Sequence, residues 1–158
     1  MNAARTGEVR GAKWGEIDLD ERLWIVSAER MKGGREHRVP LAPRAIEILR
    51  EMQASRDSDF VFPGRRAGAA LPAAALLEKL RRMGVADATA HGFRSVFRDW
   101  VSDSTNFPSE VAEMQLAHVV NDATERAYRR GDMLVKRRQM MEDWARYLTA
   151  GSASLPAP

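Results

Sequence analysis

Six side chains along the chain form a chemically coherent set for work on a phosphate ester: Arg5, Lys32, His91, Arg94, His118 and Tyr128. Two arginines can bind the non-bridging oxygens of a phosphate through paired hydrogen bonds and offset the charge that develops on phosphorus. A lysine or histidine can protonate a leaving alkoxide, and a tyrosine nucleophile would conserve the phosphodiester as a covalent phosphotyrosine. The set is therefore chemically self-consistent for a metal-free phosphoryl-transfer enzyme, and this coherence counts for more than any single member.

The pair His91 and Arg94 stands three residues apart at the start of a predicted helix. This spacing puts both side chains on one helix face, and a helix N-terminus favours anions through its free N–H groups and its dipole. The pair therefore indicates a phosphate site. The same spacing also arises by chance, and a capping histidine beside a solvated arginine explains it equally well.

Two further residues follow an apolar helical segment. His118 closes that segment, where a lone histidine more often ends a helix than acts in catalysis. Tyr128 lies among the basic residues Arg126, Arg129 and Arg130. Nearby cations stabilise a phenolate and make it a better nucleophile, whereas an average tyrosine at this position is a half-buried helix residue. The alternatives stay open on these residues alone.

Arg5 has a carboxylate, Glu8, three positions later. An acid at that spacing can orient a guanidinium, but the pair can equally be a surface ion pair of little energetic value. Lys32 stands at the tip of a predicted hairpin, where it either is solvated or extends into a groove. His37 on the returning strand and Tyr147 in the last helix are interpreted as structural residues.

The composition excludes several classes of protein. The chain has 158 residues, of which 44% are hydrophobic and 30% charged, as expected of one globular domain. The absence of cysteine excludes a disulfide scaffold, a cysteine nucleophile and a thiolate metal site. No metal-binding or nucleotide-binding motif is present, so we expect no metal and no cofactor. No apolar stretch approaches the roughly 18 residues of a membrane helix, so we expect a cytoplasmic protein without a membrane partner.

The charge is unevenly distributed along the chain. The formal net charge is only +3, but residues 91–125 hold two basic and six acidic residues, and residues 126–158 hold seven basic and three acidic ones. Such asymmetry points weakly to a polyanionic partner, and a solvated helix face is the more ordinary explanation.

The elements that must position these residues are mainly helical. Strands over residues 23–26 and 37–41, joined by a glycine turn at 31–35, form a predicted hairpin. Helices are predicted over residues 3–14, from Pro43 onward, and over 73–83, 91–104, 108–118 and 122–147. The sequence therefore predicts an α+β, mainly α domain with a small antiparallel β-sheet over residues 1–150, followed by a flexible tail at 151–158.

In this order the residues resemble the catalytic domain of the tyrosine recombinases, or phage integrases, and especially the prophage or genomic-island type. The matching stretches are residues 4–18 (ARTGEVRGAKWGEID), 31–41 (MKGGREHRVPL), 91–94 (HGFR), 116–118 (LAH) and 127–130 (AYRR). They cover nearly the whole chain in the family's order and spacing. The resemblance implies the DNA breaking-rejoining enzyme fold. It also implies site-specific DNA recombination through a 3′-phosphotyrosyl intermediate, without metal.

The resemblance also implies a role for each residue of the first four stretches. Arg5 and Arg94 would be the two arginines that clamp the scissile phosphate, with Glu8 as the accessory acid of the first. Lys32 would protonate the leaving 5′-oxygen, and His91 would assist proton transfer. These roles match the chemistry that the residue types allow.

For the last two stretches, the resemblance makes His118 a hydrogen-bond donor to the scissile phosphate and Tyr128 the nucleophile. Further DNA contacts are expected from three arginines: Arg35, Arg129 and Arg130. The implied partners are double-stranded DNA and other integrase subunits, as a tetramer on DNA for the full-length protein. No cofactor is implied.

The family differs from this chain at the N-terminus, where helices and separate DNA-binding domains precede the first arginine. We therefore expect an N-terminally truncated catalytic domain, natural or expressed as a piece, that does not recombine DNA alone. A second hypothesis is an inactive remnant that binds DNA or pairs with an integrase subunit. A third is a metal-free nuclease that uses His91 and His118 as acid and base. Residues 133–147 form either a subunit contact or the last core helix.

Overall fold

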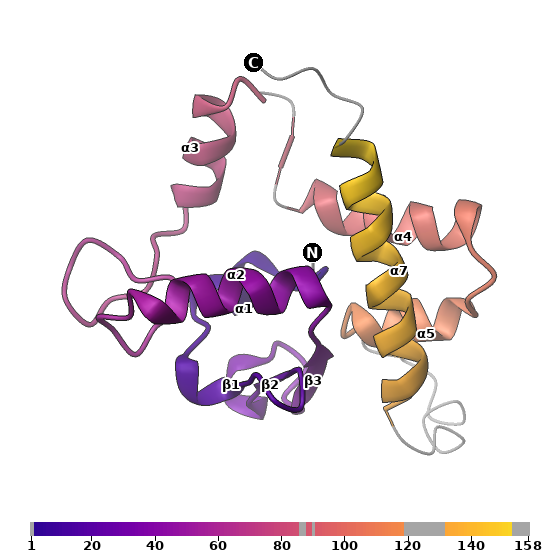
Figure 1. The fold of residues 1–158 in the computed structure, drawn as a ribbon, viewed down its shortest axis with the longest axis horizontal. Helices are drawn as coiled ribbons and strands as arrows, with labels where there is room; N and C mark the ends of the chain where they lie inside the picture. The colour runs from indigo at the N-terminus through magenta and orange to yellow at the C-terminus, as the bar shows by residue number, and fades with distance from the viewer. Residues whose placement is uncertain (1, 86–87, 90, 119–131, 153–158) are drawn as a thin grey trace.

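The computed structural model describes residues 2–85, 88–89, 91–118 and 132–152. The fold is mainly helical, with one three-stranded antiparallel sheet, which confirms the predicted fold class. Figure 1 shows the sheet on one side of the chain and the C-terminal helices on the other. None of the helices in these described ranges combines the length and the apolar character needed to cross a lipid bilayer.

The sheet consists of β1 (Ile17–Asp18), β2 (Leu23–Val26) and β3 (His37–Pro40), in that order. Trp24 of β2 pairs with Val39 of β3, and both side chains are buried beneath the sheet. The hairpin agrees with the prediction. The first strand was not predicted, because two residues are too short to show the alternation that identifies a strand.

The first helix is shorter than predicted. Helix α1 covers only Thr6–Arg10, and a separate 3-10 turn covers Trp14–Glu16. Ala3 has a left-handed backbone with φ of 51°, so a helix cannot begin there. Gly11 ends α1 after little more than one turn. Because α1 begins only at Thr6, Arg5 is its N-cap residue.

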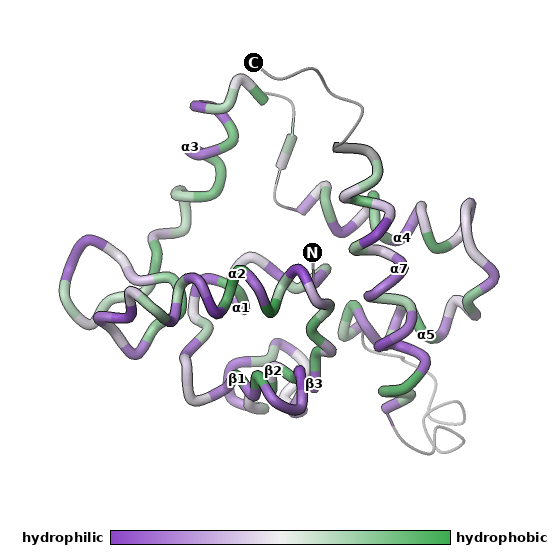
Figure 2. Tube along the Cα trace, in the orientation of Figure 1, coloured by the Kyte–Doolittle hydropathy of each residue, from purple (hydrophilic) through white to green (hydrophobic). Residues whose placement is uncertain are grey.

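Helix α2 (Pro43–Ala54) begins with proline at its first turn, where no backbone N–H is required. Its buried face packs with the sheet to form the first core, which includes Ala12, Trp14, Trp24, Val26, Val39, Leu41, Ile46, Leu49 and Val61. Helix α3 (Ala75–Arg82) follows a long loop and buries none of its residues. Hydrophobic and hydrophilic residues alternate along α3, and it stands apart from the other helices (Figure 2).

The second core lies among α4 (Gly92–Ser104), α5 (Ser109–Gln115) and α7 (Leu134–Ser152). It contains Phe97, Trp100, Val101, Val111, Ala112, Leu116, Met140, Met141 and Trp144. Aromatic rings dominate it: the ring of Trp144 meets that of Phe97 edge to face at 5.4 Å. Tyr147 stacks on Trp144 at 5.5 Å, in agreement with the structural role predicted for it. Residues 133–147 thus supply core contacts within the chain.

Helix α7 begins later than the predicted helix over 122–147, because Asp132 and Met133 are not helical. The Asp132 carboxylate accepts a hydrogen bond from the backbone N–H of Leu134 at 3.1 Å, which satisfies a free donor at the helix start. Residues 119–131 lie outside the described residues. At its other end α7 continues to Ser152, and residues 153–158 of the predicted tail lie outside the described residues as well.

Candidate active site

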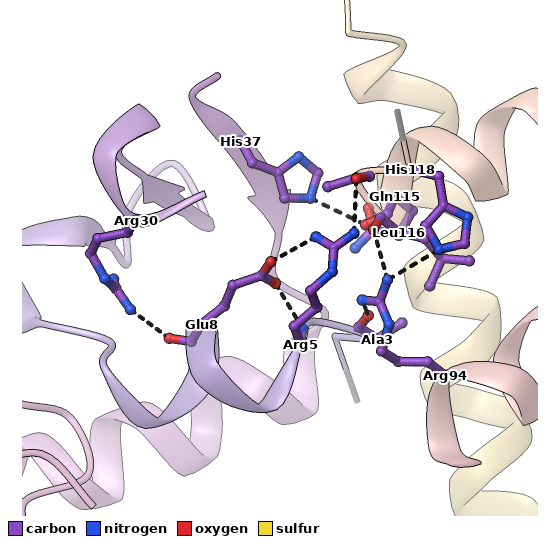
Figure 3. Close-up of polar contacts among 10 residues, drawn as sticks. Ala3, Arg5, Glu8, Arg30, His37, Arg94, Gln115, Leu116 and His118 are labelled. Atoms are coloured by element: carbon purple, nitrogen blue, oxygen red, sulfur yellow. Dashed lines mark hydrogen bonds and ion pairs between the residues drawn. The ribbon is translucent and has the colours of Figure 1, made fainter. Parts of the chain in front are cut away.

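Side chains from distant parts of the chain contact the C-terminal end of α5 (Figure 3). Ala117 takes a left-handed backbone conformation, with φ of 49°. The N–H of Ala117 donates to the carbonyl of Met114 at 3.1 Å, and that of His118 donates to Glu113 at 3.0 Å. This is the hydrogen-bond pattern of a Schellman helix end. It leaves the carbonyls of Leu116 and Ala117 free to accept hydrogen bonds from side chains.

Two arginines use these carbonyls. Nη2 of Arg94 donates to the Leu116 carbonyl at 2.7 Å, and Nη2 of Arg5 donates to the Ala117 carbonyl at 3.0 Å. The negative end of a helix dipole favours cations at such carbonyls. Two guanidinium groups, from α1 and α4, therefore lie side by side at one helix end, as Figure 3 shows.

A carboxylate fixes the first of these arginines. Glu8 is buried, and its Oε1 accepts from Nη1 of Arg5 at 2.9 Å while its Oε2 accepts from the Arg5 backbone N–H at 2.7 Å. The guanidinium of Arg30 donates to the Glu8 backbone carbonyl at 2.7 Å and so ties down the same turn. Arg5 and Glu8, three residues apart, thus form an ion pair. The Arg5 guanidinium is held by Glu8 through Nη1 and by the Ala117 carbonyl through Nη2.

Arg94 is only 6% exposed. One of its nitrogens donates to the backbone carbonyl of Ala3, and the other lies 3.4 Å from Nε2 of His118. Burial, and then the positive charge of Arg5, lower the pKa of Arg94 below its ordinary value. Two cations held this close repel each other, and a bound anion would relieve that repulsion.

His118 borders the two arginines and is 46% exposed, so a ligand can reach it. Its Nδ1 lies 2.6 Å from the Glu113 carboxylate. An arginine nitrogen can only donate, so Nε2 of His118 accepts from Arg94 and the proton of the neutral ring is on Nδ1, facing Glu113. We call Arg5, Arg94 and His118 the two-arginine cluster.

The two-arginine cluster has the composition of an oxyanion site. Each guanidinium carries five N–H donors, and Arg5 uses two side-chain hydrogen bonds within the described part of the chain. Donors therefore remain for a ligand. In the same described ranges no group of three His, Asp or Glu side chains is placed to hold a metal ion.

Some residues predicted for the active site do not contact the two-arginine cluster. His91 is exposed at the N-cap of α4, and its backbone carbonyl accepts from the N–H of Arg94 at 2.9 Å. Lys32 and Arg35 are exposed in the turn between β2 and β3. Among the described residues, no hydrogen bond or ion pair connects the side chain of Lys32 or His91 with the two-arginine cluster.

An apolar groove of about 400 Å³ also opens beside Arg94. Its walls come from the sheet, α2, α3 and the start of α4, and they include Ile48, Leu49, Leu76, Leu80 and Phe93. Such a lining does not suit a phosphate, whose oxygens require donors. The donors that could bind a phosphate therefore lie at the helix end and not along this groove.

Comparison with known proteins gives the family. The phage integrase family model matches residues 2–134. Prophage integrase IntZ of Escherichia coli K12 is 38% identical over 147 residues, which cover 92% of this chain and 36% of IntZ. The chain belongs to the phage integrase family. Prophage integrase IntA of the same strain is 35% identical over 97% of this chain, and the integrase of Shigella phage Sf6 is 32% identical over 92%.

This integrase-family chain spans well under half of the length of these relatives, 38% of IntA and 39% of the Sf6 integrase. A crystal structure of XerA recombinase superposes with a TM-score of 0.62 at 18% identity. The match covers 99% of this chain and 55% of XerA, and it shows that the two share a fold.

Three residues predicted for this integrase-family site, Tyr128, Arg129 and Arg130, lie outside the described residues. The described chain resumes at Asp132, whose carboxylate lies 3.2 Å from Nη1 of Arg38 on β3. The place of Tyr128 relative to the two-arginine cluster therefore stays a prediction.

A second polar cluster also lies at the α5 end, and we call His37, Gln115 and Arg137 the anchor cluster. Nε2 of His37 lies 3.1 Å from the Gln115 carbonyl, and Nε of Arg137 donates to Oε1 of Gln115 at 3.0 Å. Arg137 also donates to the backbone carbonyls of Arg38 and Asp132. The anchor cluster thus connects β3, α5 and α7, and Arg137 is only 1% exposed.

Burial sets the ionisation of this cluster. Burial, reinforced by the charge of Arg137, lowers the pKa of His37 to about 4. Burial also lowers the pKa of Arg137 to about 10. At neutral pH His37 is therefore uncharged and donates to the Gln115 carbonyl, in agreement with its interpretation as structural.

Sequence reasoning missed four polar residues around this helix end: Arg98, Glu113, Gln115 and Arg137. Two of them left a signal, because Glu113 and Gln115 interrupt the otherwise apolar stretch 111–117. Arg98 follows Arg94 by four residues and so shares its helix face. For Arg137 the sequence gives no signal, since basic residues surround it on α7.

Proposed function

We propose that this chain is a catalytic domain for site-specific DNA recombination that cleaves and rejoins DNA strands through a covalent tyrosine link, without a metal ion. The observation that carries the proposal is the convergence of Arg5, Arg94 and His118 on the end of α5. Membership of the phage integrase family supports it.

The two arginines bind the scissile phosphate. Their spare N–H donors contact the non-bridging oxygens, and their charges stabilise the negative charge that grows on those oxygens in the transition state. Glu8 keeps the Arg5 guanidinium in place, so little reorganisation is needed when the phosphate binds. His118, half exposed beside them, supplies a further hydrogen bond.

Tyr128 is the nucleophile in this proposal. Its phenolic oxygen attacks phosphorus and gives up its proton, which His91 helps to transfer to solvent, while the bond to the 5′-oxygen breaks and a 3′-phosphotyrosyl link forms. Lys32 delivers a proton to the leaving 5′-oxygen, with help from His91, so that a 5′-hydroxyl is released. Attack by a 5′-hydroxyl on the phosphotyrosine reverses these steps and rejoins the strand. The energy of the phosphodiester is conserved throughout.

The partners of the proposed domain are duplex DNA and further integrase subunits. Arg35, Arg129 and Arg130 contact the DNA, and subunits of a longer protein assemble as a tetramer on it. In this proposal residues 1–150 form the catalytic domain.

The test is a covalent trap. The chain is incubated with a library of duplexes that carry a nick near a randomised core, so that the short fragment released by cleavage diffuses away. We expect a protein–DNA adduct that survives denaturing electrophoresis, disappears in Tyr128→Phe and persists in Tyr147→Phe.

Other outcomes of this trap would contradict the proposal. Salt-dependent DNA binding without an adduct would indicate an inactive binding remnant. Cleaved DNA with no protein attached would indicate a nuclease that uses His91 and His118. An adduct that depends on Tyr147 would overturn the assignment of the nucleophile.

A further inference from the structure

A continuous chain of hydrogen bonds extends from the two-arginine cluster along the surface between α4 and α5. Arg94 lies 3.4 Å from Nε2 of His118, and Nδ1 of His118 lies 2.6 Å from Oε2 of Glu113. The other oxygen of Glu113 accepts from Nε of Arg98 at 2.7 Å. Arg98 in turn donates to Oγ of Ser102 at 2.5 Å.

From this chain we infer that Glu113 is a positioning residue of the active site, which fixes the ring orientation and the proton position of His118. The inference rests on the proposed function, since it assigns a second carboxylate to the same site. Glu113 does not itself reach the phosphate position. It acts through His118, as a carboxylate acts on the histidine of a catalytic triad or of a zinc site.

The geometry favours such a role over a simple surface ion pair. Glu113 is only 30% exposed, and both of its oxygens are used, one by His118 and one by Arg98. Because Arg98 holds one oxygen of the Glu113 carboxylate, the other oxygen stays in place, and its hydrogen bond restrains rotation of the His118 ring. Nε2 of His118 is thereby kept toward Arg94, in a ring that a ligand can still reach.

The lowered pKa of Glu113 also supports a positioning role. Burial tends to raise the pKa of Glu113, but the hydrogen bonds from His118 and Arg98 lower it more in sum, so the carboxylate stays charged. A charged carboxylate on Nδ1 therefore holds the imidazole ring with Nε2 facing the two arginines, where the proposed phosphate binds. Among the described residues, the charged groups in contact with this unit are Arg94 and Arg98 from α4 and Glu113 from α5, with Arg5 of the same cluster next to Arg94.

The first test needs no DNA. The chain has only three histidines, so long-range ¹H–¹⁵N spectra of the histidine rings are readily assigned with a His118→Gln variant. In the free wild-type protein we expect the neutral Nδ1–H form of His118. Glu113→Ala should lose this preference, Glu113→Gln should keep it through its amide oxygen, and Glu110→Ala, three residues earlier on α5, should not change it.

The second test uses the covalent trap together with the affinity for an intact duplex. We expect Glu113→Ala to lower the rate of adduct formation about 10- to 100-fold, the effect typical of carboxylates that orient a ligating histidine. The affinity for intact DNA should stay unchanged, because in this inference Glu113 acts through His118 and not on the DNA. Glu113→Gln should recover part of the rate, and Glu110→Ala should match the wild type.

The two tests separate failure of the inference from failure of the proposed function. If the wild-type chain forms no adduct, the proposed function fails, and the histidine spectra still decide whether Glu113 positions His118. Equal spectra for wild type and Glu113→Ala, or equal adduct rates for Glu113→Ala and Glu110→Ala, would overturn the inference.

Discussion

Two clusters built from the same kinds of residue lie at one helix end, and they differ in what surrounds them. The anchor cluster places one arginine, Arg137, and one neutral histidine, His37, in the interior. The two-arginine cluster places two cations next to a histidine that is 46% exposed. The residue types alone do not distinguish a structural cluster from one that can bind an anion. The number of neighbouring cations and the solvent exposure of the histidine do.

The hydrogen bonds of the two clusters show the same contrast. Every side-chain nitrogen of Arg137 has a partner inside the protein: the Gln115 side chain and the carbonyls of Arg38 and Asp132. Arg5 and Arg94 also use carbonyls, but their charges repel each other, and burial followed by the charge of Arg5 lowers the pKa of Arg94. A satisfied buried cation holds elements together, whereas a pair of crowded cations favours binding of an anion.

The largest expected effect is on stability at the anchor cluster. Arg137→Met removes the donor that joins α5, α7 and β3, and leaves the Gln115 side chain and two carbonyls without their partner. We expect a loss of about 3 kcal/mol in the free energy of unfolding, measured by urea denaturation. Lys136→Met, at the exposed neighbouring position, is the control and should change it little. Equal losses in both variants would show that the anchor cluster is unimportant.

The next effect is a pH dependence from the anchor cluster. His37 has a pKa of about 4 in the folded chain and about 6.5 when unfolded, so between these values only the unfolded chain binds the proton. Its contribution to stability is complete above pH 6.5 and is lost as the pH falls toward 4, by up to about 1.4 kcal/mol for each pH unit. His37→Gln should remove this slope from urea titrations, and His91→Gln should retain it. The same slope in His37→Gln would contradict the burial of His37 as an uncharged ring.

The smallest effect concerns the backbone that serves both clusters. Ala117 has φ of 49°, a conformation that glycine adopts without the steric cost of a Cβ. Ala117→Gly should therefore stabilise the fold by about 0.5 kcal/mol, measured by thermal unfolding. Ala112→Gly, within α5, should destabilise it by about 1 kcal/mol or more. If both glycines destabilise equally, the helix end does not have the described geometry.

The sequence predicted much of the fold because its elements carry local signals. The hairpin around residues 31–35 and the helix from Pro43 follow from turn residues and apolar spacing. The helix boundaries were less predictable. Helix α1 is short because Ala3 has a left-handed backbone, and α7 begins only at Leu134, after the non-helical residues Asp132 and Met133. These features depend on tertiary contacts that no local pattern records.

For the site, the residue types and the family resemblance predicted one group of six residues with Glu8 as an accessory acid: Arg5, Lys32, His91, Arg94, His118 and Tyr128. Of these, the structure places Arg5, Glu8, Arg94 and His118 together. The anchor cluster could not be predicted, because Arg137 looks like any basic residue on a helix surface until the fold buries it.

The measurement that tests this account most directly compares one arginine from each cluster in the covalent trap. Arg94→Lys and Arg137→Lys are assayed on the same nicked library, at a temperature where circular dichroism shows that both are folded. A lysine cannot reproduce the paired hydrogen bonds of a guanidinium. We predict that Arg94→Lys loses about 100-fold in adduct rate, while folded Arg137→Lys keeps the wild-type rate. An unchanged rate in Arg94→Lys, or an equal loss in both variants, would contradict the claim that the two-arginine cluster is the reacting site.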